Sequence, residues 1–359
     1  MALTYARAIA DGRAPACAYI KAACERYLTM QTREWQAKHG IYFSEEHAVE
    51  ACAFIETLHH IEGVWAGKPF VIEPWQMWIL CSIYGFRWEA DGLRVTTTVY
   101  AEIPRKNGKS LLAAGIGLYE TTVAADKGDH LYIIAPKFDQ GLKVLNPIQK
   151  MVGYNRHLMA DFGIKNTKLK SEVVSTDSDI IVLSAIGEKQ DGHNPKIVIA
   201  DEFHAVPDDL YNVMQSSQRA REESLFLMIG SAGRNCFGTG WNQRRHCIDM
   251  LEGKRAQEQW VFAAIYTVDD EDRIKWDGEK ALVKASPGAG VSINIRKAMQ
   301  DVAAAKGDPS KKAEYLRTSL NIWGMGENQL FPVENWERAA RPTLQIEQCL
   351  SLPCWVGVD

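Results

Sequence analysis

Residues 95–125 constrain the fold of this chain more than any other stretch. A β-like run at 95–103 leads into a short loop ending in Gly-Lys-Ser, and an apolar, helix-like run begins at Leu111. A strand, such a loop and a helix form the layout of a P-loop, in which backbone N–H groups and the helix N-terminus surround a phosphate chain. The stretch therefore predicts a phosphate-binding loop on an α/β sheet.

The polar residues of this loop fit that chemistry. Gly108 lets the backbone approach closely, Lys109 neutralises the β- and γ-phosphates, and the hydroxyl of Ser110 can ligate Mg²⁺. The usual first glycine, five residues before Gly108, is replaced by Ile103. Gly-Lys-Ser alone is a weak signal, and its position between a strand and a helix strengthens it.

Size and composition narrow the class of protein. The 359 residues suit one large α/β domain plus a smaller unit. A net charge of −4 means that any nucleic-acid contact must come from a local patch. None of the eight cysteines forms Cys-x-x-Cys, so we expect reduced thiols rather than a zinc site. No signal-peptide core and no apolar run of membrane-spanning length is found, and we expect a soluble intracellular protein.

Apolar runs and helix signals divide the rest of the chain. We expect long helices over 2–38 and 44–61, then further helices at 139–152, 293–305 and 309–323. Strands are expected at 131–135, 178–185, 197–201, 224–231 and 260–266. This alternation predicts an α/β fold with a mostly parallel sheet flanked by helices, and a small helical subdomain near the C-terminus.

A second candidate site lies at residues 196–204, Lys-Ile-Val-Ile-Ala-Asp-Glu-Phe-His. The apolar run ends in two carboxylates, which places Asp201 and Glu202 at the C-terminal edge of a buried strand, where ligands bind in open α/β sheets. Asp201 would hold Mg²⁺, directly or through water, and Glu202 would polarise the attacking water. The alternative is that both carboxylates cap a helix, and the presence of Gly-Lys-Ser favours the functional interpretation.

Two other positions carry weaker signals. Gln76 stands at a helix start opened by Pro74, and its amide can pair with both N6 and N7 of adenine; by spacing alone, a surface glutamine is the simpler interpretation. Ser231 lies in the Gly-Ser-Ala-Gly loop at 230–233, after a strand. It can sense a γ-phosphate or belong to a tight turn, and the spacing leaves both open.

Taken in order, these residues resemble the large terminase subunit of tailed bacteriophages, over about residues 63–359. The motifs that carry the resemblance are an adenine motif at 74–76, a deviant Walker A at 104–110 with Arg105 as its arginine, a Walker B region at 191–205, a coupling motif at 230–233 and a linker stretch, Leu-Asn-Ile-Trp, at 320–323. The resemblance implies a RecA-like (ASCE) P-loop NTPase that uses ATP and Mg²⁺ to drive double-stranded DNA into a preformed capsid.

The resemblance also implies roles for individual residues. Glu202 would orient water and Arg105 would stabilise charge on the γ-phosphoryl group, a task that Lys106 could share. Mg²⁺ would be held by Ser110 and Asp201. The expected nucleotide-binding residues are Gln76, Arg105, Lys106, Asn107, Gly108, Lys109 and Ser110, and the expected coupling residues are Ser231, Ala232 and Gly233.

Partners and domains follow from the same resemblance. We expect double-stranded DNA, a portal protein and a small terminase subunit as partners, with the protein in the host cytoplasm, transiently on the procapsid, as a homo-oligomeric ring and without a membrane. The expected domains are an N-terminal helical flank (1–62), a P-loop ATPase core (63–240), a linker subdomain (241–352) and the first strand of an RNase H-like nuclease (353–359).

The end of the chain departs from the family's pattern. Val-Gly-Val-Asp at 356–359 resembles the first nuclease strand, with Asp359 as its first metal-binding aspartate. A nuclease site of that type needs several carboxylates to hold two divalent metal ions, and one aspartate cannot hold them. We therefore expect a truncated protein, with nuclease activity in the parent and none in this chain.

A basic stretch is the candidate DNA surface. Packaging cannot depend on sequence, so contacts should go to phosphates. Residues 137–170 carry a local charge of +5, although charge runs are usually solvated faces. Against Asp139 and Asp161 the stretch holds Lys137, Lys143, Lys150, Arg156, Lys165, Lys168 and Lys170.

Two rival functions remain at this point. Residues 201–204 match the Asp-Glu-x-His box of a DNA or RNA helicase, but such a helicase needs a second ATPase-like core, and the residues after Gly233 are too few. The other rival is a capsid-docking module that binds ATP without hydrolysing it. Glu202 argues against this, because pure binding needs no water-orienting carboxylate.

Overall fold

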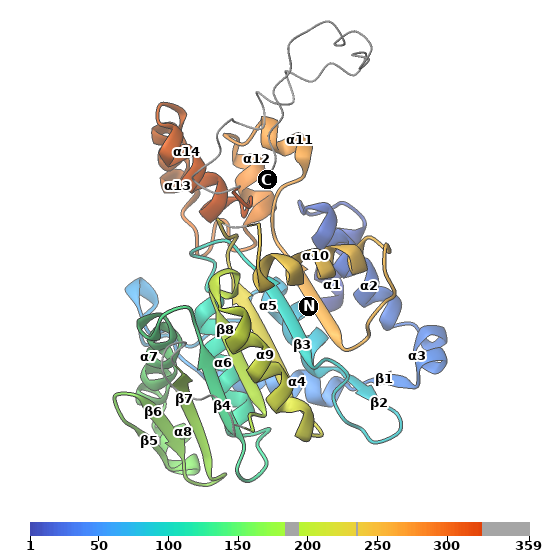
Figure 1. Cartoon of the computed structure of the whole chain (residues 1–359), viewed down its shortest axis with the longest axis vertical. Coiled ribbons are helices and arrows are strands. Elements are labelled where there is room, and N and C mark those ends of the chain that lie inside the picture. The colour runs from blue at the N-terminus through green and yellow to red at the C-terminus, as the bar shows by residue number, and fades with distance from the viewer. Residues whose placement is uncertain (184–193, 235, 325–359) are drawn as a thin grey trace, which may run out of the picture. The chain divides into compact units, whose positions relative to one another are not determined.

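The computed structural model describes residues 1–183, 194–234 and 236–324. Its centre is an eight-stranded sheet (Figure 1). The first six strands of the order below are parallel, and the last two form an antiparallel extension. The order is β10 (Val261–Ile265), β3 (Thr98–Glu102), β9 (Leu225–Gly230), β8 (Ile197–Asp201), β4 (His130–Ile134), β7 (Ser178–Leu183), β6 (Lys170–Val173) and β5 (Ile164–Asn166).

Helices cover both faces of this sheet, as expected for parallel strands. One face is covered by α1 (Ala2–Ala10), α2 (Ala18–Met30), α4 (Glu45–Glu56), α5 (Pro74–Tyr84), α6 (Lys109–Thr121) and α7 (Phe138–Tyr154). The other is covered by α9 (Asp208–Ser217) and α10 (Thr239–Leu251), which cross in front of the strands in Figure 1. Short elements complete the core, namely α3 (Arg33–His39), α8 (Arg156–Phe162), the β1 (Ile41–Phe43)–β2 (Phe86–Trp88) ribbon and 3₁₀ turns at Gly63–Trp65, Phe203–Ala205 and Gln218–Ala220.

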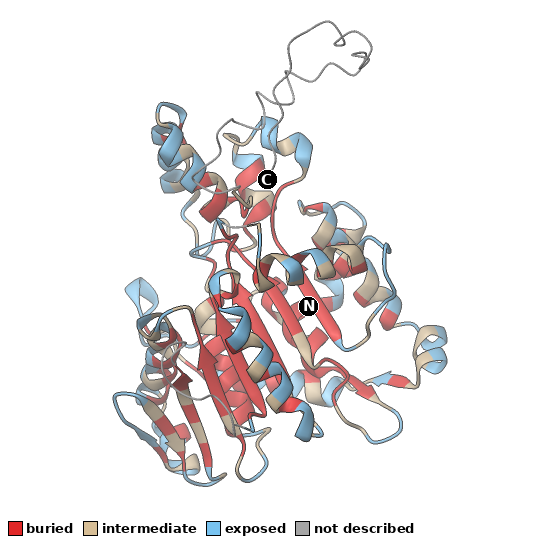
Figure 2. Ribbon diagram, viewed as in Figure 1, coloured by how far each residue is buried: buried red, intermediate tan, exposed pale blue. Residues whose placement is uncertain are grey.

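Strand β8 shows how the sequence builds the two apolar layers. All five of its residues are buried, and the central strands appear red in Figure 2. Ile197 and Ile199 pack into the layer under α6, whereas Val198 and Ala200 pack into the layer under α9 and α10. A period of two with apolar residues on both sides is the pattern of a strand buried on both faces. The predicted mostly parallel α/β fold is confirmed.

The N-terminal region is more broken than its sequence suggested. The single helix expected over 2–38 is wrong, because the chain forms α1, α2 and α3 instead. Gly12, with a φ of 71°, ends the first helix at a conformation that favours glycine. A second break precedes α3, where the Thr32 side chain accepts the backbone N–H of Trp35 as an N-cap.

After β10 the chain forms a small helical layer. It consists of α11 (Asp270–Ile274), α12 (Glu279–Ala285), α13 (Ile295–Lys306) and α14 (Pro309–Ser319), which share an apolar cluster of their own. Because β10 is paired with β3 and residues 1–324 form one compact unit, the predicted boundary after residue 240 falls inside that unit. Nowhere in the described ranges does a helix have both the length and the apolar character to cross a membrane.

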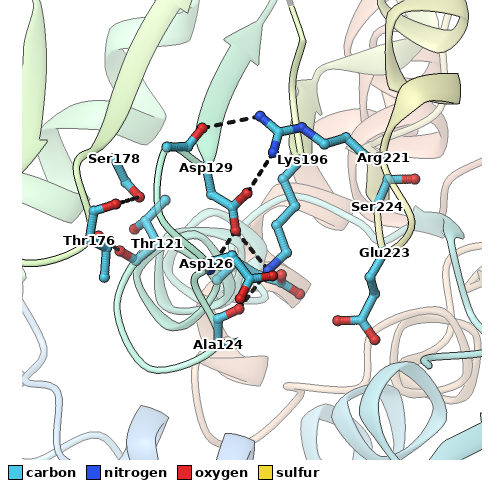
Figure 3. Close-up of polar contacts among 12 residues, drawn as sticks. Thr121, Ala124, Asp126, Asp129, Thr176, Ser178, Lys196, Arg221, Glu223 and Ser224 are labelled. Carbon is cyan, nitrogen blue, oxygen red and sulfur yellow. Dashed lines mark hydrogen bonds and ion pairs between the residues drawn. The ribbon is translucent and has the colours of Figure 1, made fainter. Parts of the chain in front are cut away.

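A buried ionic network closes the N-terminal edge of the sheet (Figure 3). Asp129, just before β4, accepts from Lys196 Nζ at 2.9 Å and from Arg221 Nη1 at 3.0 Å. Lys196 Nζ also donates to the carbonyl of Ala124 at 2.6 Å. Since each charge is partnered, this network holds strand starts together and leaves the opposite edge, at the strand C-termini, for ligands.

Candidate active site at the carboxyl edge of the sheet

The predicted phosphate loop joins β3 to α6. Gly108 is the N-cap of α6, with a φ of 78°, and Lys106 has a φ of 70°. Left-handed residues of this kind turn successive backbone N–H groups toward one concavity, which suits an anion. Glycine fits at 108 because a side chain in this conformation is strained. The local geometry of a P-loop is therefore present without the usual first glycine.

A cavity of about 730 Å³ opens beside this loop. The cavity brings the two predicted sites together, because residues from the phosphate loop and from the end of β8 both line it. The lining comprises Glu62, Arg105, Lys106, Gly108, Lys109, Ser110, Leu111, Pro136, Lys137, Gln140, Lys143, Asp201, Glu202, His204 and Ala205. Of these, Glu62, Gln140 and His204 carry polar side chains that were not predicted to have a role, and Lys137 and Lys143 were predicted only as part of the basic stretch at 137–170.

Lys109 and Asp201 are opposite charges held out of water. Lys109 is 7% exposed and Asp201 is 4% exposed. Burial lowers the pKa of Lys109, while Glu202 and Asp201 oppose that shift. Burial, together with Glu202, raises the pKa of Asp201 to about 6, against the attraction of Lys109.

One oxygen of the Asp201 carboxylate accepts no hydrogen bond from the described residues. Its Oδ1 is buried and lacks a hydrogen-bond partner within the described part of the chain. A buried carboxylate oxygen without a donor is costly, and a hard divalent cation would satisfy it. The residues therefore fit Mg²⁺, with Asp201 and Ser110 as protein ligands. No group of three or more His, Cys, Asp or Glu side chains arranged for a metal occurs among the residues that the structure describes, so most oxygens would come from nucleotide and water.

Glu202 is held in a strained position at the tip of β8. Its φ of 48° and ψ of 47° place a non-glycine residue in the left-handed region. Its Oε2 lies 3.4 Å from the Ser231 hydroxyl, which donates to it, and 3.3 Å from Nδ1 of His204. His204 was not predicted to belong to the site. The sequence signal for it is the Asp-Glu-x-His spacing at 201–204, which also resembles a helicase box.

Asn107 and Arg105 tie the loop to the C-terminal helical layer. Asn107, predicted to bind nucleotide, is 2% exposed and donates Nδ2 to the carbonyls of Pro104 at 3.1 Å and Arg105 at 3.3 Å. Its Oδ1 accepts the N–H of Gly288 at 2.8 Å. The backbone N–H of Arg105 donates to the carbonyl of Thr318 at 3.0 Å. The Asn107 side chain therefore shapes the loop, whereas the exposed side chains of Arg105 and Lys106 line the cavity.

Gln76 lies beside the loop but has a structural task as well. It is 4% exposed, and its Oε1 accepts the N–H of Glu73 at 2.9 Å in a capping box that starts α5. Its Nε2 lies 3.9 Å from where a side chain at Gly108 would place its Cβ. Gln76 is not among the residues that line the cavity, so its adenine role stays a prediction.

The predicted coupling residues connect three segments. Ser231 is buried at the end of β9, between the strands that carry the loop and Asp201. Ala232 donates its N–H to Oδ1 of Asn321 at 3.0 Å. Gly233 packs so closely that a Cβ there would lie 2.7 Å from the ring of Trp323. The predicted linker stretch at 320–323 is thus in direct contact with the coupling residues.

The predicted basic surface at 137–170 is divided by the fold. Lys137 and Lys143 line the cavity. Lys150 lies 3.6 Å from Glu62, and Lys170 lies 2.5 Å from Glu172, two partners outside the counted stretch. A count along the sequence missed these carboxylates, so the stretch is not one free basic surface. Arg156, Lys165 and Lys168 remain exposed.

Some predicted positions lie outside the described residues. They are residues 191–193 of the Walker B region and Asp359, with the rest of 353–359. For these positions the roles given above stay predictions.

The fold and this edge together define a RecA-like P-loop ATPase. A loop ending in Gly-Lys-Ser follows one strand, a carboxylate pair follows another, and the strand with Ser231 lies between them. Comparison with known proteins names the family. The model of the terminase large subunit ATPase domain matches residues 74–248, and that of the terminase large subunit endonuclease domain matches 254–359. The chain belongs to the terminase large subunit family.

The endonuclease match begins well before the predicted nuclease start at residue 353. The described part of that match includes β10, which pairs with β3 in the ATPase sheet, and the helical layer that follows. Structure and family model therefore divide this region differently.

Individual relatives resemble parts of the chain. Protein YmfN of Escherichia coli (strain K12) is 31% identical over 170 residues, which are 47% of this chain and 37% of that protein. The large terminase of bacteriophage HK97 superposes with a TM-score of 0.65 at 23% identity, over 77% of this chain and 55% of that one. The Thermus phage P74-26 large terminase ATPase domain gives a TM-score of 0.34 at 20% identity, over 40% of this chain and 62% of that one. This chain thus spans only part of the length of YmfN and of the HK97 protein.

Proposed function

We propose that this chain is the ATPase motor of viral genome packaging, which hydrolyses ATP to move double-stranded DNA into a procapsid. The observation that carries the proposal is the cavity lined by buried Lys109 and by buried Asp201, whose Oδ1 has no hydrogen-bond partner among the residues that the structure describes. A phosphate chain with Mg²⁺ supplies the charges that both groups lack. Membership of the terminase large subunit family supports the DNA-packaging role.

The loop would hold the triphosphate. Backbone N–H groups of residues 106–110 and the N-terminus of α6 would surround its phosphates, with the Lys109 ammonium on the β- and γ-phosphates. Mg²⁺, held by Ser110 and Asp201, would neutralise charge on the phosphates. Gln76 would contact adenine through Nε2 and the second lone pair of Oε1, because the first accepts from Glu73.

Two side chains would act on the reaction itself. Glu202 lines the cavity and would orient the attacking water, with its carboxylate positioned by Ser231 and His204. Arg105 reaches the same cavity from the loop and would stabilise negative charge on the γ-phosphoryl group. Removal of such an arginine typically lowers the rate about 10³-fold or more.

Loss of phosphate would reach the rest of the molecule through β9. Ser231 contacts Glu202, and the next residue, Ala232, is hydrogen-bonded to Asn321. A small shift of Glu202 during hydrolysis would therefore move the linker stretch at 320–323 against the sheet. We propose this route as the coupling between ATP hydrolysis and DNA movement.

The partners proposed are double-stranded DNA, a portal protein and a small terminase subunit. The motor would work in the host cytoplasm as a homo-oligomeric ring on the portal of a procapsid. Contacts to DNA would go to its phosphates, because packaging proceeds through every sequence of a genome. Exposed Lys165 and Lys168 near the β5–β6 hairpin are the first candidates for such contacts.

Steady-state ATP hydrolysis with and without DNA tests the proposal. We expect Lys109→Ala to lose ATP binding and Glu202→Gln to bind ATP while hydrolysis falls by about 100-fold or more. Lys127→Ala, which removes an exposed lysine away from the cavity, is the matched control. A chain that binds ATP but never hydrolyses it would support the docking-module alternative.

DNA unwinding by the same preparation would support the helicase alternative. After β9 the described residues add one strand to the same sheet and a helical layer, rather than a second ATPase core. We therefore expect DNA-dependent ATP hydrolysis without strand separation.

A further inference from the structure

Arg317 is a buried cation that has no ion-pair or hydrogen-bond partner for its side chain in the described part of the chain. It lies in α14, is only 8% exposed, and precedes Thr318, whose carbonyl accepts the backbone N–H of Arg105 at 3.0 Å. Within residues 1–183, 194–234 and 236–324, neither a carboxylate at ion-pair distance nor a hydrogen bond satisfies its guanidinium. Taking a charge out of water without such partners is unfavourable.

The surroundings of Arg317 increase this cost. Besides burial, Arg105 and Arg234 act to lower its pKa, while Glu314 and Glu202 act in the opposite direction. Arg105 from the phosphate loop and Arg234 from the residues after the coupling motif thus lie close enough to Arg317 in α14 for their charges to act on it, and so does Glu202. Cations that are close enough to perturb one another are stabilised when an anion lies among them.

We infer that Arg317 binds the terminal phosphate of the nucleotide together with Arg105. The inference rests on the proposed ATPase function and adds a phosphate-binding residue from the helical layer to it. Arginine suits this task because its guanidinium stays charged when buried and offers paired N–H donors to phosphate oxygens. Glu314 and Glu202 are the carboxylates that compensate the charge of Arg317 in part before nucleotide binds.

This contact would make the helical layer sensitive to the state of the nucleotide. Tyr315 on α14 packs with Val302 and Ala305 of α13 in the apolar cluster of that layer. The terminal phosphate is present in ATP and absent from ADP, so only ATP would hold α14 against the loop through Arg317. Release of phosphate would leave the hydrogen bonds from Arg105 N to the Thr318 carbonyl and from Gly288 N to Asn107 Oδ1 to join the layer to the loop.

Nucleotide binding to Arg317 variants of the whole chain tests the inference. With Mg²⁺ present, we expect Arg317→Ala to weaken binding of the non-hydrolysable analogue AMP-PNP by about 10-fold or more, while ADP binding changes less than about twofold. The rate of ATP hydrolysis should fall as well, and Arg317→Lys should restore part of both properties. Arg296→Ala, on the exposed side of α13, is the control and should behave as the wild type.

Thermal unfolding shows whether an Arg317 variant loses nucleotide binding only because it is unfolded. Arg317→Met keeps the volume and removes the charge, so without nucleotide it should melt at or above the wild-type temperature. AMP-PNP should then stabilise it no more than ADP does. Equal losses for AMP-PNP and ADP, or an Arg317→Ala variant that matches Arg296→Ala, would overturn the inference. If the wild type itself neither binds nor hydrolyses ATP, the proposed function fails instead.

Discussion

At the scale of single residues, the site is built from groups that are individually unfavourable. Glu202 adopts a left-handed backbone conformation, and Asp201 and Lys109 are buried charges. Strain and desolvation of this kind concentrate at functional sites, where the surrounding fold maintains them. Under the proposed function, a phosphate chain and its cation would offset these costs.

Asp201 gives this idea a pH-dependent consequence. Its pKa is about 6 in the folded chain and 3.8 ordinarily. Between these values the folded chain keeps a proton that the unfolded chain has released, so stability falls as pH rises from about 4 to about 6 and stays lower above it. At about 1.4 kcal/mol per pKa unit, the loss is about 3 kcal/mol.

We expect Asp201→Asn to remove this pH dependence. In buffer without Mg²⁺ and nucleotide, the variant should be more stable than the wild type at pH 7.5, by up to about 3 kcal/mol, and nearly equal to it at pH 4. Urea unfolding at both pH values measures the difference. Asp126→Asn changes an exposed aspartate and should leave the curve unaltered. A less stable Asp201→Asn variant at pH 7.5 would contradict the explanation.

At the scale of elements, the phosphate loop depends on a layer far along the chain. Asn107 joins the loop to Gly288, and Arg105 joins it to Thr318. The conformation of the loop is therefore fixed both by strand β3, which precedes it, and by hydrogen bonds to the helical layer. Its conformation is a property of two elements together.

Asn107→Ala tests this dependence. The substitution leaves the N–H of Gly288 without its acceptor and frees two loop carbonyls, which should cost about 1–3 kcal/mol in unfolding free energy. Nucleotide affinity should fall as well, although Asn107 is not among the residues that line the cavity. Denaturant unfolding and nucleotide titration measure the two effects. Asn107→Asp keeps the acceptor for Gly288 but places a buried carboxylate oxygen against the carbonyls of Pro104 and Arg105, so it should lose at least as much stability as alanine. A more stable aspartate variant would argue against the two donated hydrogen bonds.

Sequence patterns predicted the strands of the core and several residues that line the cavity at its carboxyl edge. The strand that ends at Asp201 and the loop ending at Ser110 were found because apolar runs, turn residues and their order are local signals. The partner of Asn107 and the burial of Arg317 were not predicted. Gly288 lies 181 residues from Asn107, and no local pattern specifies which distant backbone group a buried amide will meet.

Charge was predicted less well than secondary structure. Seven basic residues between 137 and 170 suggested one DNA-binding surface. A net charge summed along the sequence ignores the carboxylates that the fold brings next to these residues. Lys150 forms an ion pair with Glu62 of the N-terminal flank, and Lys170 forms one with Glu172, two residues further along the chain. The periodicity that identified strands carries no information about such pairs.

At the scale of the whole molecule, the exposed remainder of this stretch is the testable DNA surface. We expect Lys165→Glu with Lys168→Glu to weaken DNA binding and to reduce the slope of log affinity against log salt by about 2, because each phosphate contact contributes about 0.9. DNA-stimulated hydrolysis should fall while hydrolysis without DNA is retained. Titrations at several salt concentrations measure the slope.

A matched pair of substitutions controls for charge alone. Lys297→Glu with Lys311→Glu makes the same change on exposed positions of α13 and α14. If both double variants weaken DNA binding equally, the effect is one of net charge and the hairpin is not a specific contact.

The arrangement of the sheet also sets the order in which the protein can be assembled during synthesis. Strand β3 carries the phosphate loop, yet its two neighbours are β9 and β10, which leave the ribosome more than a hundred residues later. The backbone tie at Thr318 comes later still. A nascent chain ending before β9 therefore has the predicted phosphate-binding sequence without its supporting strands, and we expect ATP binding to begin only when translation has passed the helical layer.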